Sequence, residues 1–134
     1  MLEFTMPFPP SVNHLYFHRA IKRRGSDKWG VMKGVDKPGK EYFQAVTVSL
    51  IEQGISRRKL DVRLAVEIVV VPPDRIRRDL DNICKAALDA LTHANVWADD
   101  WLIDDLRIVR AGVEKPGRLK VKVAPTPGQT KQLF

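Results

Sequence analysis

The stretch DVRLAVEIVVVPPDRIRRDLDNICKAALDAL, residues 61–91, predicts a strand, a charged loop and a helix in succession. Apolar side chains occupy every second position over 62–70, which is typical of a strand with one buried face. Pro72 and Pro73 end this strand, because proline has no N–H to continue a β-ladder. From Asp79 onward the apolar spacing becomes helical. The resulting stripe consists of Leu80, Ile83, Cys84, Ala87, Leu88 and Leu91.

Further elements are predicted on either side of this stretch. Residues 2–8 and 118–124 alternate apolar with polar side chains and predict strands, and 103–111 predicts another. Residues 40–54 fit both a helix and a strand, and their length favours the helix. Residues 11–40 are polar, basic and glycine-rich, which predicts a long loop.

The order of these elements is β-α-β-α-β-β. It predicts an α+β fold with a single two-layer domain, in which the helices pack on one face of a mixed sheet. A length of 134 residues suits one domain with its own core. The domain is expected to span 1–124, and the tail over 125–134 is expected to be flexible.

The charge of the chain narrows the functional classes. The sequence has 23 Lys and Arg against 16 Asp and Glu, a formal net charge of +7. A basic surface suits a polyanion, above all nucleic acid. No apolar run reaches the roughly 18 residues of a membrane span, no secretion leader is recognised, and the single cysteine, Cys84, cannot form an internal disulfide. We therefore expect a cytoplasmic protein that makes no membrane contact.

Two interpretations fit the acids that begin the predicted helix. In the first, Asp79 caps the helix, Asp81 interacts with the helix dipole, and Asp81 forms an ion pair with Lys85 one turn later. In the second, the two carboxylates bind a hard cation such as Mg²⁺, which takes one or two carboxylates together with water and substrate phosphate. Lys85 would then contact a phosphate oxygen or stabilise charge that develops on phosphorus.

Neighbouring residues extend the second interpretation. Arg75, Arg77 and Arg78 directly precede the helix and are placed to hold a phosphate backbone. Asp99 and Asp100 follow the helix, and they supply a third carboxylate only if the chain folds back along it. The surrounding sequence matches neither a calcium-binding hand nor a zinc motif, and it has no glycine-rich phosphate loop.

Three motifs stand out once the chain is considered as a whole: FPPSVNHLY at 8–16, PDRIRRDLDNICKAALDAL at 73–91 and VWADD at 96–100. Together they resemble the RusA family of Holliday-junction resolvases from bacteria and their phages, over roughly residues 2–124. The resemblance implies a small homodimeric endonuclease that cuts branched DNA with Mg²⁺, for which Mn²⁺ is an expected substitute. It also implies a cytoplasmic protein encoded by a bacterium or a phage.

The resemblance assigns roles to individual residues. It implies that Asp79, Asp81 and Asp100 are catalytic acids that bind the metal, and that Lys85 is an essential catalytic lysine. Four further residues fall in matching motif positions with less defined roles: Asn13, Arg78, Asn82 and Asp99. Of these, Asn13 and Arg78 are expected to bind DNA.

Junction resolution fits the symmetry of a homodimer. A four-way junction has two strands of like polarity to cut, and a two-fold dimer has two sites related by its axis. Paired symmetric nicks would then leave ligatable duplexes. Two alternatives remain open: a nuclease that acts mainly on flaps or forks, and a junction-binding protein that does not cleave.

The predicted basic loop is expected to contact DNA. Lys22, Arg23 and Arg24 would bind phosphates and make the affinity depend on salt. Trp29 would stack on an exposed base, or alternatively it would cap the hydrophobic core.

The tail ends in Leu133 and Phe134, two apolar residues without an evident core to join. It resembles, imperfectly, the peptides that bind the bacterial sliding clamp, which begin with Gln and end in Leu-Phe. Gln129 stands one residue too far from the end for the five-residue form, and Thr130 occupies the expected place. The tail is therefore a candidate contact for the clamp, or alternatively it packs on this protein or its dimer partner or stays disordered.

Overall fold

The structure is a computed structural model that describes residues 1–11, 15–22, 24–25, 27–55 and 57–126, with the backbone alone at 17–19. Within these residues, two helices and a short 3-10 turn accompany six strands. The helices are α1 (Lys37–Glu52) and α2 (Leu80–His93), and the turn is η2 (Asp100–Leu102). The strands are β1 (Leu2–Pro7), β2 (Tyr16–Lys22), β3 (Trp29–Val35), β4 (Leu64–Val71), β5 (Ile103–Arg110) and β6 (Arg118–Pro125).

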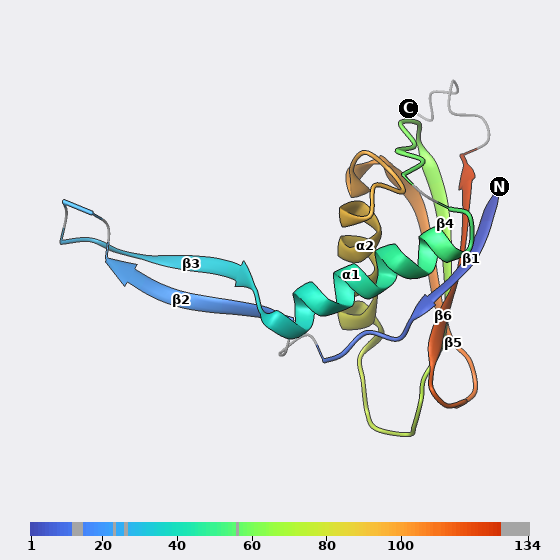
Figure 1. The fold of residues 1–134 in the computed structure, drawn as a ribbon, viewed down its shortest axis with the longest axis horizontal. Helices are drawn as coiled ribbons and strands as arrows, with labels where there is room; N and C mark the ends of the chain where they lie inside the picture. Colours follow the sequence, from blue (N-terminus) through green and yellow to red (C-terminus); the bar gives the residue numbers. More distant parts are fainter. Residues whose placement is uncertain (12–14, 23, 26, 56, 127–134) are drawn as a thin grey trace, which may run out of the picture.

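Four of the strands form a mixed sheet in the order β1-β6-β4-β5, in which only the β4–β5 pair is parallel. Both helices lie on one face of this sheet (Figure 1). The prediction of an α+β domain with helices on one face of a mixed sheet is confirmed.

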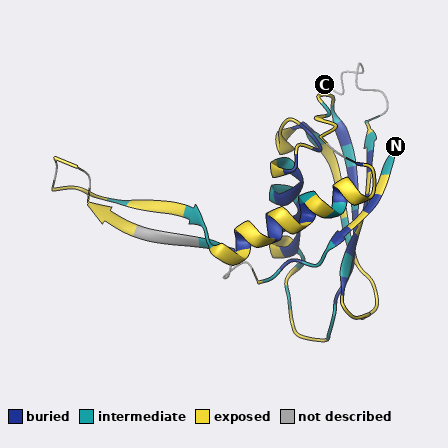
Figure 2. Ribbon diagram, viewed as in Figure 1, coloured by how far each residue is buried: buried dark blue, intermediate teal, exposed yellow. Residues whose placement is uncertain are grey.

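The core lies between the sheet and the helices, as the burial colours show (Figure 2). Leu64, Val66, Ile68 and Val70 of β4 are buried, as the alternation predicts, whereas Val62 precedes the strand and is 50 % exposed. Other buried residues come from the neighbouring strands and from the apolar stripe of α2: Phe4, Met6, Leu119, Val121, Val123, Ile83, Ala87 and Leu91. None of the described helices is both long enough and apolar enough to cross a bilayer.

The predicted loop over 11–40 is wrong. Residues Tyr16–Lys22 and Trp29–Val35 pair as an antiparallel hairpin, which forms its own two-stranded sheet. This hairpin projects from the body as an arm (Figure 1). The outer part of the arm extends away from the rest of the described structure (Figure 1). Its strands therefore need no buried face, and they lack the one-sided apolar pattern that identifies a strand in a sequence. Trp29 lies near the tip and is 68 % exposed, so it does not cap the core.

The boundaries of the other elements differ less from the predicted ones. Helix α1 begins at Lys37, before the predicted start, with a proline in its first turn. A turn precedes β6, and in it Gly117 has a φ of +83°, which glycine adopts without a steric cost. Strand β6 includes Pro125, which pairs with Leu64. The N–H of Thr126 also donates to the carbonyl of Arg63 at 3.0 Å, so the first two residues of the predicted tail join the body. Residues 127–134, with the expected clamp motif, lie outside the described residues, and that motif stays a prediction.

The base of the arm is joined to α1 through a close backbone contact at Gly39. The N–H of Asp36 donates to the carbonyl of Leu15 at 2.8 Å. A Cβ at Gly39 would collide with that same carbonyl oxygen and lie 2.7 Å from Cγ1 of Val35. A glycine is therefore required here by space rather than by backbone conformation.

We expect Gly39→Ala to lower the free energy of unfolding by about 1–2 kcal/mol, because the clash with backbone outweighs the ~1 kcal/mol that alanine normally gains in a helix. Urea denaturation of the two proteins measures the difference. Gly112→Ala is the matched control, since a Cβ there meets no atom within 4 Å. If Gly39→Ala is as stable as the wild type, the arm does not sit on α1 in this way.

Candidate active site

Asp79, the acid that precedes α2, does not cap the helix with its side chain. Asp79 occupies the N-cap position with extended backbone angles, yet its side chain makes no capping hydrogen bond. Asp81 lies in the first turn, exposed, and its Oδ1 accepts a hydrogen bond from the N–H of Asn82 at 2.9 Å. The structure therefore contradicts the capping role of Asp79 and leaves its carboxylate at the surface.

Lys85 lies one turn further along the same exposed face. The first interpretation paired it with Asp81, but its Nζ lies 3.2 Å from Oδ2 of Asp89 instead. The lysine side chain is 58 % exposed, whereas that of Asp89 is 31 % exposed. The ammonium can thus reach solvent or a ligand while it stays in contact with its acid.

Asp89 also receives the Tyr16 hydroxyl, which donates a short hydrogen bond to the same Oδ2. The Lys85 ammonium lies 4.9 Å from the centre of the Tyr16 ring. Partial burial, then the bond to Asp89, raises the pKa of Tyr16 well above its ordinary value. Asp89 and Tyr16 were not identified as site residues from the sequence. The i,i+4 spacing from Lys85 to Asp89 was visible, but the approach of Tyr16 depends on the tertiary fold.

After α2 the chain returns toward the helix at Asp100. Trp97 is fully buried, and its indole N–H donates to Oγ1 of Thr92 at 2.7 Å, which anchors the return. Asp99 caps the turn η2 by accepting the N–H of Trp101 at 3.2 Å. Partial desolvation of the carboxyl group raises the pKa of Asp100, and so do a hydrogen bond with Asp99 and the negative charges of Asp99 and Asp89.

The negative charge of Asp89 contributes to the raised pKa of Asp100, so the returning segment faces α2 near Asp89. Asp89 lies roughly 12 Å along the helix axis beyond Asp81, at 1.5 Å per residue. Among the described residues, no three of the His, Cys, Asp and Glu side chains lie close enough together to hold a metal ion. The fold thus brings Asp100 back to α2 without gathering it with Asp79 and Asp81 into one preformed ligand set.

An exposed tryptophan lies next to Asp100. Trp101 is 68 % exposed, and the guanidinium of Arg63 lies 4.3 Å from its ring centre. Arg63 also forms an ion pair with Asp104 and donates to the carbonyl of Trp101 at 3.0 Å. This fixed aromatic surface was not predicted from the sequence.

The three arginines before α2 have different surroundings. Arg78 donates to Asp74 at 2.7 Å and its guanidinium lies 5.1 Å from the centre of the Phe8 ring, so it helps to hold the loop in place. That hydrogen bond lowers the pKa of Asp74. Arg75 and Arg77 are exposed and present their guanidinium groups to solvent.

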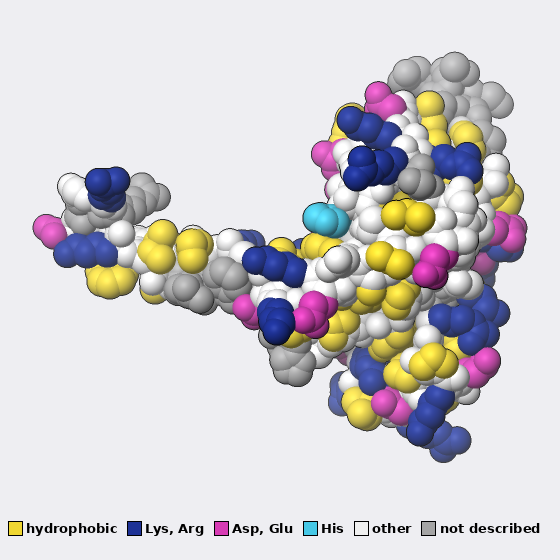
Figure 3. Space-filling view, viewed as in Figure 1, with side chains coloured by type: hydrophobic (Ala, Val, Ile, Leu, Met, Phe, Trp, Pro, Cys, Tyr) yellow, Lys and Arg dark blue, Asp and Glu magenta, His cyan; other side chains and the backbone are white. Residues whose placement is uncertain are grey.

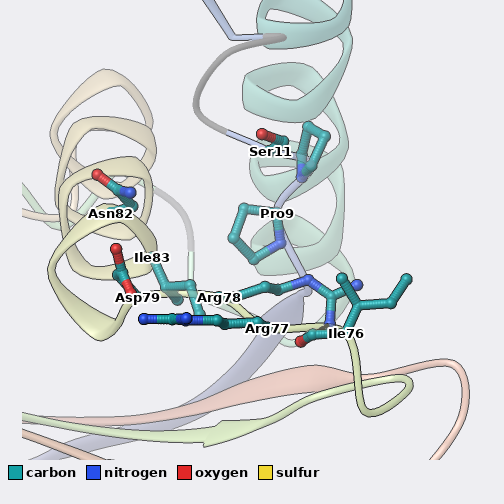
Figure 4. A pocket seen from close by; sticks show the side chains of 9 residues that line it. Pro9, Ser11, Ile76, Arg77, Arg78, Asp79, Asn82 and Ile83 are labelled. Carbon is teal, nitrogen blue, oxygen red and sulfur yellow. Dashed lines mark hydrogen bonds between the residues drawn. The ribbon is translucent and has the colours of Figure 1, made fainter.

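A cleft of about 540 Å³ lies where this loop meets the start of α2. Figure 4 shows Asp79 and Asn82 projecting from the first turn of α2 on one side of it, with Pro9 and Ser11 on the other. The side chains of Arg77 and Arg78 lie along one edge of the cleft. Anionic and cationic groups thus share one opening, an arrangement that suits a phosphate together with a cation.

Basic side chains also gather on the arm. Figure 3 shows Lys and Arg side chains at its tip as well as on the body. Lys22 pairs with Trp29 in the last register position of the hairpin, and Arg24 follows in the turn. Asn13 and Arg23, two of the predicted DNA-binding residues, lie outside the described residues.

Comparison with known proteins agrees with these observations. The family model of endodeoxyribonuclease RusA matches residues 7–124. A relative from Enterobacteria phage HK97, named crossover junction endodeoxyribonuclease, is 38 % identical over 126 residues, which cover 90 % of this chain and 92 % of the relative. The protein of the same name from Escherichia coli K12 is 38 % identical over 125 residues, with the same coverage. The chain therefore belongs to the RusA family of endodeoxyribonucleases.

Proposed function

We propose that this protein is a crossover junction endodeoxyribonuclease, which resolves four-way DNA junctions by paired symmetric nicks with Mg²⁺ as its cofactor. The observation that carries the proposal is the uncapped carboxylate of Asp79 in a cleft edged by Arg77 and Arg78. Asp81 and Lys85 follow it on the exposed face of α2. The curated relatives bear the name of this activity. The single cysteine is buried and unpaired, which suits work in the reducing cytoplasm of a bacterial cell.

The carboxylates fit a hard cation by their chemistry. Asp79, Asp81 and Asp100 offer oxygen ligands. Partial desolvation, then the hydrogen bond with Asp99 and the charges of Asp99 and Asp89, raise the pKa of Asp100, and a bound cation would offset this cost of its negative charge. Mg²⁺ needs only one or two carboxylates when water and substrate phosphate complete its shell. When bound, Mg²⁺ lowers the pKa of a coordinated water and polarises the phosphate. Mn²⁺ accepts the same oxygen ligands and is expected to substitute.

The cationic side chains act on the phosphate. The exposed ammonium of Lys85 can contact a non-bridging oxygen and stabilise the charge that develops during attack. Arg75 and Arg77 hold the neighbouring backbone, where a planar guanidinium matches two phosphate oxygens. Positioning by these groups converts DNA binding into an oriented attack on one phosphodiester.

The arm extends the DNA surface beyond the cleft. Lys22 and Arg24 carry positive charge at its tip, and Trp29 exposes a ring that can stack on a base left unpaired at a crossover. A homodimer would present two arms and two sites about a two-fold axis, as two simultaneous nicks require. Incubation with four-way, flap, fork and linear DNA in Mg²⁺ tests the proposal. We expect the four-way junction to be cut fastest, and equal cutting of linear duplex would refute it.

Asp81→Asn is expected to reduce nicking of a four-way junction by more than about 100-fold, because even the loss of an outer partner of a metal ligand costs 10- to 100-fold. Junction affinity should stay unchanged or tighten, since the lost carboxylate repels phosphate. Gel-shift and nicking assays measure the two quantities. Asp61→Asn, an exposed aspartate before β4, is the control. A folded Asp81→Asn that nicks at the wild-type rate means that Asp81 binds no catalytic metal.

Asp100→Asn is expected to stabilise the protein in EDTA at neutral pH. Because the folded pKa of Asp100 lies above its ordinary value of 3.8, the folded state holds this proton more strongly than the unfolded state does. The wild type therefore loses stability as the pH rises through the folded pKa of Asp100. The asparagine side chain does not ionise, so the variant avoids this loss.

Thermal unfolding of both proteins from pH 3 to pH 8 measures the difference. The extra stability of Asp100→Asn should vanish below pH 3.8, the ordinary pKa of the carboxyl group, because both states of the wild type are then protonated. Mg²⁺ should stabilise the wild type more than the variant. If the variant is less stable than the wild type at pH 7 in EDTA, the pKa of Asp100 is not raised in the folded state.

Replacing Arg75 and Arg77 together by Gln is expected to weaken junction binding and to reduce the slope of log affinity against log salt by about 2, because roughly one unit of slope goes with each phosphate that an arginine neutralises. The matched control is Arg57→Gln with Arg58→Gln. Those residues precede β4, whereas Arg75 and Arg77 follow it, so eight strand residues, roughly 26 Å, separate the two pairs. An unchanged slope for the first pair would place the loop away from DNA.

A further inference from the structure

Three side chains from two distant segments meet on the exposed face of α2. Oδ2 of Asp89 accepts hydrogen bonds both from Lys85 Nζ, at 3.2 Å, and from the Tyr16 hydroxyl. The Lys85 ammonium also lies 4.9 Å from the centre of the Tyr16 ring. We call these residues the Tyr16–Lys85–Asp89 cluster. Each of its members contacts the other two.

This cluster differs from an ordinary ion pair on a helix surface. Such a pair contributes only a few tenths of a kcal/mol, because both side chains move freely in water. Here the acid is 31 % exposed and is held by a tyrosine from a separate element. The aromatic ring lies against the ammonium, which favours one direction of the lysine chain.

A matched pair on α1 shows the contrast. Lys37 and Glu41 have the same i,i+4 order of lysine and acid, but their contact is 4.0 Å and their side chains are 88 % and 66 % exposed. That pair is therefore the ordinary case. Glu41→Ala therefore serves as a control, because it removes the acid partner of a helical lysine that lies outside the face formed by Asp81 and Lys85.

Tyr16 links the cluster to the arm. It is the first residue of β2 and pairs with Val35, the last residue of β3. Both residues pack against the core, and the preceding Leu15 is fully buried. The hydroxyl bond to Asp89 thus fastens the base of the arm to the face of α2 that carries Lys85.

We propose that Asp89 is a positioning residue, which holds the Lys85 ammonium in the orientation needed for cleavage and ties it to the arm through Tyr16. The proposal rests on the nuclease function proposed above. A long lysine side chain has several rotatable bonds, so an unheld ammonium spends little time at the phosphate. An acceptor that is itself fixed by a tyrosine limits this freedom before DNA binds.

The first test measures single-turnover nicking of a four-way junction by excess enzyme. We expect Asp89→Ala to slow nicking on the order of 10- to 100-fold, since a displacement of about 1 Å costs up to 100-fold, with junction affinity within about twofold of wild type. Alanine is the best helix former, so α2 should remain folded. Tyr16→Phe keeps the ring and loses the hydroxyl, and it should slow nicking only a few-fold. Glu41→Ala should nick at the wild-type rate.

A second test asks whether Asp89 acts through the lysine. In the Lys85→Ala background, Asp89→Ala should cause no further loss of rate, because the group that it positions is already absent. The same fold-loss in both backgrounds would overturn the proposal, and so would wild-type nicking by Asp89→Ala itself.

A third test needs neither DNA nor metal. Limited acetylation followed by mass spectrometry compares the labelling of Lys85 with that of Lys37 in the same molecule. Asp89→Ala should increase the relative labelling of Lys85, and equal ratios in both proteins would overturn the proposal. If the wild type cuts no branched substrate while this ratio does change, the nuclease function fails and the positioning of Lys85 stands.

Discussion

The packing of α2 against the sheet is the constraint on which the candidate site depends. Its apolar stripe, with Ile83, Ala87 and Leu91, is buried in the core. The opposite face must therefore point outward, and it carries Asp81 and Lys85. One helix thus fixes both the core and the positions of the candidate catalytic groups. A substitution that rotates α2 would therefore expose apolar side chains and at the same time move Asp81 and Lys85 away from their present positions.

Short connections place further groups around this helix. The loop from β4 delivers the arginines to its first turn, and Arg78 holds that loop through Asp74 and Phe8. Beyond the helix, the buried Trp97 anchors the return that presents Asp100. The arm begins at Tyr16, in contact with Asp89 on the same helix. The arginine loop, the returning acidic segment and the base of the arm therefore all meet α2.

Much of this arrangement could be predicted from the sequence, because burial on one face leaves a periodic apolar pattern. The stripe of α2 and the alternation of β4 are of this kind. The hairpin was missed because none of the side chains described in its two strands is fully buried, and because its basic composition is typical of a loop. The partner of Lys85 was also missed. Local spacing allowed either Asp81 or Asp89, and the contact of Tyr16 with Asp89 depends on the tertiary fold.

The most direct test of the account is to map the cuts that the purified protein makes in a four-way junction with Mg²⁺. Each of the four strands is end-labelled in turn, and the products are sized and then treated with DNA ligase. The account predicts two nicks at symmetric positions in strands of like polarity, with duplex products that ligase can seal. Cuts in a single strand, unrelated positions in opposite strands, or no cleavage of the junction would contradict it.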